Sequence, residues 1–263
     1  MNTIQDLLFD DYNRRQSLEV SIDSINQSSF NTKQAGHFIF ENDFWSPLPY
    51  EGFAVVSMLD EDKVNEPLSN RLVGLQKDLR LVVEPSNGFY FLPPESFHQT
   101  IANTLSADRF NKHIVETGLE VAYPDLVKKA FETIPVFQLN QPIRMKMIGL
   151  AVFGTAIGIL GIFENESEYK AITQFRSAFY NDAGLSQLDV KMTRPFIGHV
   201  TLAYIESDLD VNQESQLAHA MNEINESLKS EMNYFAISSA ELRRYHHLAE
   251  FTRKDNFPIF RFN

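Results

Sequence analysis

The chain has 263 residues, of which 43% are hydrophobic and 22% are charged, so the composition predicts a soluble globular protein with a sizeable core. It has no cysteine, which excludes a disulfide framework, a thiol nucleophile and a cysteine zinc site, and we expect a reducing, cytoplasmic compartment. The formal charge of −12 argues against binding along a long nucleic acid, because such binding needs Lys and Arg to neutralise phosphates. A small or terminal phosphate in a local pocket is compatible with this charge.

The start of the chain is polar. We interpret residues 1–44 as a polar N-terminal extension that could be partly helical, followed by a single bilobed domain at 45–263. The N-terminus lacks the basic start and the long apolar stretch of a secretory signal. The uncharged segment 147–163 contains several glycines, and Gly154-Thr155 in its middle favours a turn between buried strands over a membrane span. No membrane association is expected.

The same order of elements is predicted twice along the chain. In each half, an apolar strand precedes an amphipathic helix, and a later strand carries a histidine and a threonine. In the first half, about 45–150, the strands are expected at 53–59, 88–92 and 97–102, and the helix at 67–79. In the second half, about 151–263, the strands are expected at 156–163 and 197–205, and the helix around 169–179. Further helices are expected within 110–134 and 217–228, and closing strands within 136–153 and 234–251.

Two motifs lie at corresponding points of these halves. His98-Gln99-Thr100-Ile101 and His199-Val200-Thr201-Leu202 share the pattern His, any residue, Thr, aliphatic. Only about 0.3 His-x-Thr triplets are expected by chance in such a chain, so two in matching places are informative. Side chains two residues apart in a strand share a face, so each motif presents an imidazole beside a hydroxyl. Tyr204 is expected on the opposite face, in the core. The alternative is that both motifs are ordinary half-buried sheet residues.

Facing across a cleft, the two motifs could hold one phosphate. The hydroxyls of Thr100 and Thr201 would donate hydrogen bonds to its non-bridging oxygens. One neutral imidazole could accept a proton from water, while the other, protonated, donates one to the leaving oxygen. We assign His199 as the base and His98 as the acid, although the similarity of the motifs leaves the order open. This chemistry needs no metal and no cofactor.

Other candidate residues have weaker patterns. Arg194, just before the second motif, could contact a phosphate, and a solvated loop arginine is the alternative. His246 and His247 are adjacent, so a strand would direct them to opposite faces, which is unsuitable for sharing a metal. Trp45 and Tyr50 could stack on a base, or could simply cover the edge of the core.

At these motifs the sequence resembles the 2H phosphoesterase superfamily, which is named for its paired His-x-Thr/Ser motifs. The resemblance is strongest at 92–101 and 196–204, and it extends over about 45–251 in the order of elements. A proline before the first motif resembles the pattern typical of bacterial RNA 2′,3′-cyclic phosphodiesterases, once described as 2′-5′ RNA ligases. The segment 49–59, the Leu-Pro-Pro stretch at 92–94 and the closing Thr-Leu-Ala-Tyr at 201–204 look closer to a sparsely characterised microbial branch. The resemblance implies an α+β, pseudo-two-fold duplicated fold whose antiparallel sheets line a central cleft, with helices outside.

The function expected from the motifs and the resemblance is metal-independent hydrolysis of a small or terminal phosphodiester to a phosphomonoester. A 2′,3′-cyclic nucleotide or a short RNA end is the expected substrate. Hydrolysis of a 2′-5′ phosphodiester or of cyclic ADP-ribose phosphate is an alternative within the same chemistry. A non-catalytic nucleotide-binding protein that uses the same cleft is an alternative from another class. A monomer is compatible with all of these.

Overall fold

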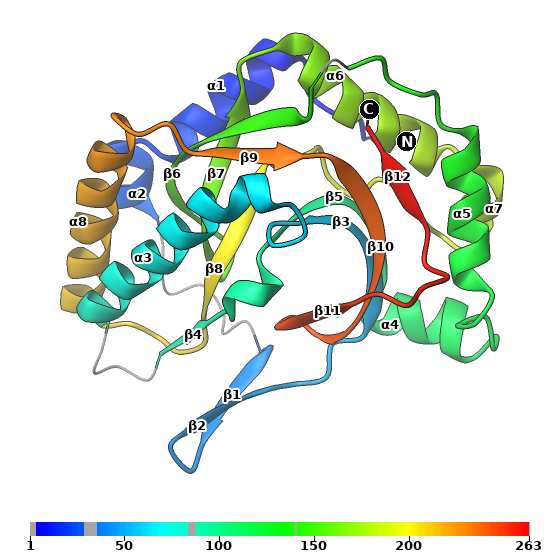
Figure 1. The fold of residues 1–263 in the computed structure, drawn as a ribbon. Helices are drawn as coiled ribbons and strands as arrows, with labels where there is room; N and C mark the ends of the chain where they lie inside the picture. The colour runs from blue at the N-terminus through cyan, green and yellow to red at the C-terminus, as the bar shows by residue number, and fades with distance from the viewer. Residues whose placement is uncertain (1–3, 29–35, 84–87, 140, 263) are drawn as a thin grey trace.

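A computed structural model describes residues 4–28, 36–83, 88–139 and 141–262 of an α+β protein with antiparallel sheets (Figure 1). Its helices are α1 (Phe9–Glu19), α2 (Ile22–Gln27), α3 (Glu66–Val83), α4 (Ala107–Phe110), α5 (Tyr123–Thr133), α6 (Glu166–Tyr180), α7 (Ala183–Gln187) and α8 (Val211–Leu228). Its strands are β1 (Phe38–Glu41), β2 (Phe44–Pro47), β3 (Gly52–Met58), β4 (Phe89–Phe91), β5 (His98–Ser106), β6 (Ile143–Phe153), β7 (Ala156–Phe163), β8 (His199–Ile205), β9 (Tyr234–Ile237), β10 (Ser239–His247), β11 (Glu250–Thr252) and β12 (Ile259–Arg261).

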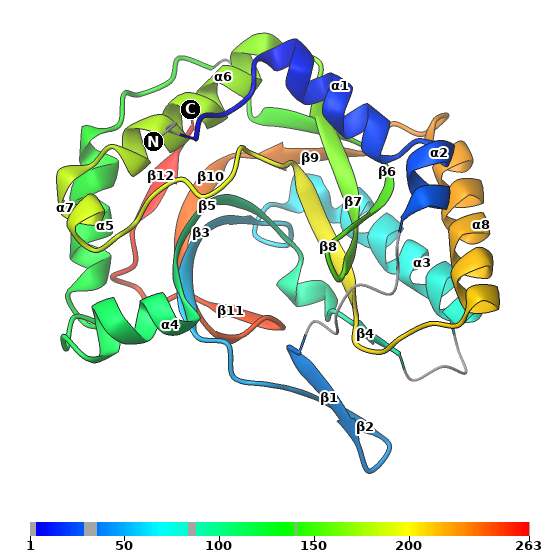
Figure 2. The same ribbon diagram turned by 180° about the vertical axis from the view of Figure 1, so that it is seen from behind.

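The described strands form two larger sheets and a hairpin. The first sheet has the order β11-β10-β3-β5, with β12 also paired to β10, and it curls into a half-barrel (Figures 1 and 2). The second sheet has the order β4-β8-β7-β6-β9. Helices lie around the outside of both sheets, and the β1–β2 hairpin projects away from the body (Figure 2).

The two sheets do not follow the two halves of the chain. Strand β10, near the C-terminus, pairs with β3 in the first sheet. Strand β4, from the first half, pairs with β8 in the second sheet. Strand β6, predicted to close the first half, instead pairs with β7, because the two are joined by a tight turn in which Gly154 has a φ of 63°. Each sheet therefore combines strands from both predicted halves.

The elements with strong apolar patterns form as predicted. Strand β3 is buried along its whole length, and the helices α3 and α6 bury the apolar stripes that predicted them. The segment 147–163 is the β6–β7 hairpin rather than a membrane span. Among the described residues, no helix is both long and apolar enough to cross a membrane.

The region predicted to be a polar extension contributes two helices to the body of the protein, while its residues 1–3 and 29–35 lie outside the described ranges. Helix α1 packs against β7, and the side chains of Tyr12 and Gln16 are fully or almost fully buried. The polar composition of this region gave no indication of these contacts. Gln16 can be buried because its amide donates hydrogen bonds to backbone carbonyls, and no apolar surface is needed. The β1–β2 hairpin was not predicted either.

Strand β3 separates two groups of buried side chains. Phe53 and Val55 face the main core, whereas Ala54, Val56 and Met58 form a smaller apolar cluster with Tyr245 on the other face. This division follows from the two-residue period of a strand. The smaller cluster matters for the site, because it lies on the face of the sheet that carries the first motif.

Candidate active site

Each motif begins a strand, and its alternate side chains fall on different faces. In β5, His98 and Thr100 are partly exposed, whereas Gln99 is buried. In β8, Thr201 is partly exposed and His199 retains 9% exposure, whereas Val200 is buried. In β5 this alternation agrees with the prediction that the imidazole and the hydroxyl of a motif share one face, whereas in β8 both His199 and Val200 are buried.

A β-bulge interrupts both motif strands at the same motif position. Between β3 and β5 the pairing shifts so that Ile101 is the additional residue. Between β7 and β8 it shifts so that Leu202 is the additional residue. The fourth residue of each motif is therefore a bulge residue, whose backbone is free to bond outside the sheet.

The bulge at Leu202 also changes the position of Tyr204. The sequence places this side chain on the face opposite His199, but an extra residue in the strand reverses the alternation beyond it. In the structure Tyr204 is partly exposed, and its ring lies 5.8 Å from that of His37 and 5.5 Å from that of Phe38. Tyr204 still packs against the main core, as expected, but it remains partly exposed.

The two imidazoles are oriented in the same way. Nδ1 of His98 lies 2.7 Å from the carbonyl oxygen of Ser96, and Nδ1 of His199 lies 2.9 Å from that of Ile197. A carbonyl oxygen only accepts hydrogen bonds, so each neutral imidazole carries its proton on Nδ1. Nε2 of each ring is then the nitrogen left to accept or donate a proton during a reaction.

Each imidazole also lies against a phenylalanine ring. The ring of His98 is 4.2 Å from that of Phe251, and the ring of His199 is 4.9 Å from that of Phe153. Burial in these surroundings lowers the pKa of each histidine from 6.5 to about 4, and the bond to the carbonyl offsets part of this effect. Both rings are therefore neutral at pH 7 in the absence of a ligand.

Positive groups near the histidines contribute to the low pKa values. After burial, the charge of Arg243 on β10 is the next influence that lowers the pKa of His98. At His199, Arg194 and His98 both act in the same direction after burial. His98 is the smallest of these influences on the pKa of His199. Arg243 was not predicted, and its ordinary position in a strand offered no signal.

Gln99, the middle residue of the first motif, connects the two motifs directly. Its side-chain oxygen accepts the backbone N–H of His199 at 2.6 Å, and its amide nitrogen donates to the carbonyl of Ile197 at 3.1 Å. The same amide nitrogen donates to the carbonyl of Thr100 at 2.7 Å. The carbonyl of Ile197 also accepts a hydrogen bond from the imidazole of His199. Gln99 therefore supports that imidazole indirectly, through the Ile197 carbonyl. The available signal was a polar residue between His98 and Thr100, at a position that alternation places on the face opposite these two residues.

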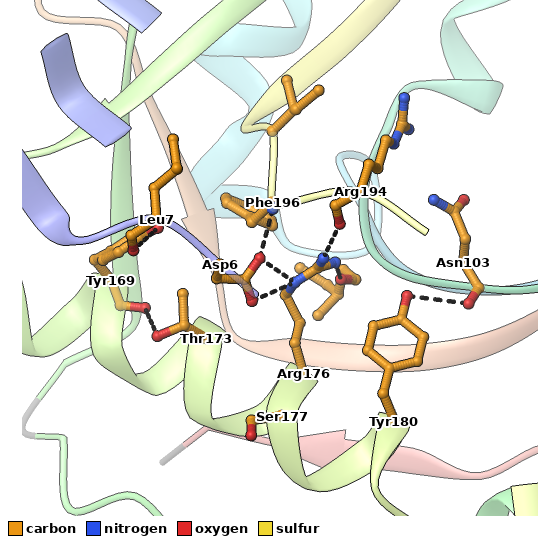
Figure 3. Close-up of polar contacts among 12 residues, drawn as sticks. Asp6, Leu7, Asn103, Tyr169, Thr173, Arg176, Ser177, Tyr180, Arg194 and Phe196 are labelled. Carbon is orange, nitrogen blue, oxygen red and sulfur yellow. Dashed lines mark hydrogen bonds and ion pairs between the residues drawn. The ribbon is translucent and has the colours of Figure 1, made fainter. Parts of the chain in front are cut away.

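Arg194 was predicted as a possible phosphate contact. In the structure its backbone carbonyl is held by a hydrogen bond, whereas its side chain is not part of that contact. Its carbonyl accepts a hydrogen bond from Arg176 of α6 at 3.0 Å, while its own guanidinium points away from that contact (Figure 3). The side chain is exposed, and its charge reaches His199. Arg194 is thus available to an anion beside the second motif.

The remaining candidates have structural partners. His246 contacts Glu51 at 2.8 Å, and His247 is 3.8 Å from Glu250. Trp45 packs against Phe40 and Tyr90, and Tyr50 packs against His37 and Tyr245. Within the described residues, no group of three His, Asp or Glu side chains is arranged to hold a metal ion.

A cavity of about 460 Å³ adjoins the first motif. Its walls include Met58, which pairs with His98, and Phe251, whose ring contacts His98. Its charged side chains are the acidic Asp60, Glu61, Glu95 and Glu250 and the basic Arg243. Burial and the neighbouring carboxylates raise the pKa of Asp60. Arg243, which lines the same cavity, acts in the opposite direction on the pKa of Asp60 and offsets part of this negative charge.

No protein-family model matches this chain, and a search of curated proteins found no match. Among solved structures it is similar to a conserved protein of unknown function, ATU0111 from Agrobacterium tumefaciens strain C58, with a TM-score of 0.63 and 18% identity. That match covers 92% of this chain and 98% of the other. It shows that the two proteins share a fold. A second structure, TT0787 of Thermus thermophilus, aligns with a TM-score of 0.41 and 14% identity, over 73% of this chain and 87% of the other.

Proposed function

We propose that this chain is a metal-independent phosphodiesterase of the 2H phosphoesterase superfamily, which hydrolyses a small or terminal phosphodiester to a phosphomonoester. The observation that carries the proposal is the matched environment of His98 and His199. Each ring donates Nδ1–H to the carbonyl two residues earlier, packs against a phenylalanine and has a threonine two residues on. Two histidines prepared in the same way, with Nε2 left for proton transfer, suit a paired acid and base.

We further propose that the fold is duplicated and that the two motif faces line a central cleft. The units β3-α3-β5 and β7-α6-β8 have the same order, and a third strand lies beside each, in the orders β10-β3-β5 and β6-β7-β8. The bulges at Ile101 and Leu202 occupy the same motif position. These correspondences support a pseudo-two-fold relationship between the two motifs.

In the proposed reaction, a water oxygen attacks the phosphorus while Nε2 of His199 accepts a proton from that water. The bond between phosphorus and a ribose oxygen breaks, and the imidazolium of His98 gives its proton to the departing oxygen. Thr100 and Thr201 donate hydrogen bonds to non-bridging oxygens as negative charge gathers there. The products are a phosphomonoester and a free ribose hydroxyl, and solvent exchange restores the two protonation states.

The low pKa values fit this scheme when the substrate itself is included. An anionic phosphodiester between the rings favours the charged form of an imidazole, so its binding raises the pKa of the histidine that acts as the acid. Burial ensures that the other histidine stays neutral and can accept a proton. The substrate therefore supplies the charge that converts two neutral rings into an acid and a base.

A small substrate is favoured by the charge of the protein. The chain has a net charge of −12, and the cavity beside His98 is lined by four carboxylates and one arginine, so a long polyanion would be repelled. A 2′,3′-cyclic nucleotide or a short RNA end carries few phosphates and avoids this repulsion. Hydrolysis of a 2′-5′ phosphodiester or of cyclic ADP-ribose phosphate would use the same groups.

The test is product analysis after incubation with 2′,3′-cyclic nucleotides, 2′-5′ dinucleotides and cyclic ADP-ribose phosphate. We expect conversion of at least one of these to a phosphomonoester, and its loss in His98→Ala and His199→Ala variants. Ligand-dependent thermal stabilisation without turnover would instead indicate a nucleotide-binding protein. Turnover that survives both substitutions would overturn the proposal.

A further inference from the structure

Arg176 of α6 makes polar contacts with three separate segments of the chain. It is 3% exposed, and its Nε lies 2.9 and 3.1 Å from the two carboxylate oxygens of Asp6 (Figure 3). One terminal nitrogen donates to the carbonyl of Ile101 at 2.6 Å, and the other donates to the carbonyl of Arg194 at 3.0 Å. The planar fork of a guanidinium suits such a role, because it directs several donors in fixed directions.

The two carbonyls that Arg176 binds belong to the first motif strand and to the segment before the second. Ile101 is the bulge residue that follows Thr100, and the bulge leaves its carbonyl free to accept from the helix. Arg194 lies on the approach to the second motif, and Asp6 accepts the backbone N–H of Phe196 on the same approach at 2.5 Å. The Asp6–Arg176 pair thus joins the first motif to the segment that leads to His199.

The N-terminal segment makes further bonds directly beside the second motif. The hydroxyl of Tyr12 accepts the N–H of Gly198 at 3.2 Å, and Gln16 donates to the carbonyl of Gly198 at 2.8 Å. A Cβ atom on Gly198 would overlap the Tyr12 hydroxyl, so helix α1 approaches this backbone as closely as glycine permits. Asp6, Tyr12 and Gln16 all bond to backbone within three residues of His199.

The other half of the chain has a counterpart to Arg176. Gln76 on α3 is 5% exposed, and it donates to the carbonyl of Leu202, the second bulge residue, at 2.8 Å and to that of Leu92 at 2.7 Å. Gln76 and Arg176 occupy the same position in their helices, counted from Glu66 and Glu166. Each helix therefore binds the bulge of the motif strand that belongs to the other half.

We propose that Arg176, fixed by Asp6, is a positioning residue that sets the placement of His98 relative to His199. This inference rests on the proposed function of the two histidines. A glutamine suffices at the bulge of the second motif, whereas Arg176 must also hold the approach to His199, which needs its additional donors. The carboxylate of Asp6 offsets the cost of burying the guanidinium, and it ties the N-terminal segment to the site.

The test compares Arg176→Lys and Asp6→Asn with Arg71→Lys as a matched control. Lysine keeps the charge at 176 but loses the fork, and asparagine keeps the shape at position 6 but loses the charge. Arg71 makes a similar two-bond pair with Glu231, at 2.8 Å for both bonds, on the outer helix α3. Its substitution controls for the loss of an arginine–carboxylate pair away from the motifs.

Two measurements separate positioning from folding. The first is kcat and KM with a 2′,3′-cyclic nucleotide, where Arg176→Lys and Asp6→Asn should lower kcat about 10- to 100-fold and change KM much less. The second is the NMR spectrum of the histidine side chains without substrate, in which the signals of both His98 and His199 should shift. Arg71→Lys should alter neither measurement.

The imidazole spectra keep this inference distinguishable from the proposed function. If the wild-type protein cleaves none of the phosphodiesters, the proposed function fails, while the spectra still report whether Arg176 positions both rings. Unchanged spectra in a folded Arg176→Lys or Asp6→Asn variant would overturn the inference. Unfolding of both variants, with Arg71→Lys intact, would also overturn it, because the pair would then be purely structural.

Discussion

The side-chain oxygen of Gln99 accepts the backbone N–H of His199 at 2.6 Å, so a residue of the first motif holds the main chain of the second. Its amide nitrogen bonds to the carbonyl of Ile197, which also accepts from the imidazole of His199. The two motif strands belong to different sheets, and this amide spans them. The placement of the two histidines thus depends on a single buried side chain as well as on the sheets.

Gln99→Met should weaken both the fold and the proposed activity. Methionine preserves the approximate size but leaves the N–H of His199 without its acceptor and removes one of the two hydrogen bonds to the carbonyl of Ile197, which costs about 1–3 kcal/mol of unfolding free energy. A shift of His199 by a fraction of an ångström should lower kcat by roughly 10- to 100-fold. Denaturant unfolding and steady-state kinetics measure the two effects.

Asn65→Leu provides the control for Gln99→Met. Asn65 is also buried and bonds in both directions to one residue, accepting the N–H of Ala236 at 2.8 Å and donating to its carbonyl at 3.1 Å. It lies away from the motifs, so its loss should reduce stability by a similar amount while the remaining folded protein keeps its kcat. Equal kcat losses in both variants would show that Gln99 has no particular influence on His199.

Substitution of the motif residues tests their chemical roles. His98→Ala and His199→Ala should each reduce kcat by about 10²- to 10⁴-fold, the usual contribution of a positioned acid or base. Thr100→Val and Thr201→Val nearly preserve volume but remove a hydrogen bond to phosphate, and the loss should appear in kcat if that bond strengthens in the transition state. His98, Thr100 and Thr201 are partly exposed and His199 retains some exposure, so circular dichroism should report folded variants. Losses of rate that merely follow the loss of folded protein would contradict these roles.

Local pattern predicted the elements of this fold better than it predicted their pairing. The run at β3 and the stripes of α3 and α6 predict a strand and two helices because burial imposes a period on the sequence. The pairing of β10 with β3 and of β4 with β8 depends on contacts between distant segments, which periodicity does not encode. The division of the sheets between the two halves was missed for this reason.

In the candidate site, too, the sequence predicts local features of single residues better than contacts between distant ones. The His-x-Thr spacing predicts a shared face, and the alternating burial of β5 agrees with it. The bulges were not predictable, because an additional residue such as Leu202 looks like any other aliphatic residue in a strand. Asp6 and Arg176 are 170 positions apart, and nothing in either local sequence indicates that they form a buried pair.

The low pKa values of the two histidines predict how stability changes with pH. Each imidazole has a pKa of about 4 in the folded chain and about 6.5 when unfolded, so the unfolded state binds more protons between these values. The unfolding free energy should therefore fall as the pH decreases from about 6.5 towards about 4, and it should be independent of these groups above that range.

His98→Gln and His199→Gln isolate this contribution to stability. Each substitution removes one titrating group and so makes the unfolding free energy depend less steeply on pH. The slope should decrease by up to about 1.4 kcal/mol per pH unit for each imidazole that no longer takes up a proton on unfolding. The measurement is denaturant unfolding of the wild-type and variant proteins at several pH values from about 4.5 to about 7.5, which spans the ordinary titration of histidine. Parallel curves for the wild type and both variants would show that neither imidazole has a lowered pKa.

The same pKa values predict that kcat/KM is highest on the acidic side of the ordinary histidine range. This parameter reports the protonation states of the free enzyme, in which the reactive form has one neutral and one charged imidazole. With both pKa values at about 4, that form becomes scarcer as the pH rises, so kcat/KM should fall about tenfold per unit well above the higher apparent pKa. The profile for kcat should extend to higher pH, because the bound phosphate anion raises the pKa of the acid. Steady-state rates over a range of pH with one cyclic nucleotide measure both profiles, and a kcat/KM that stays level through neutral pH would contradict the low values.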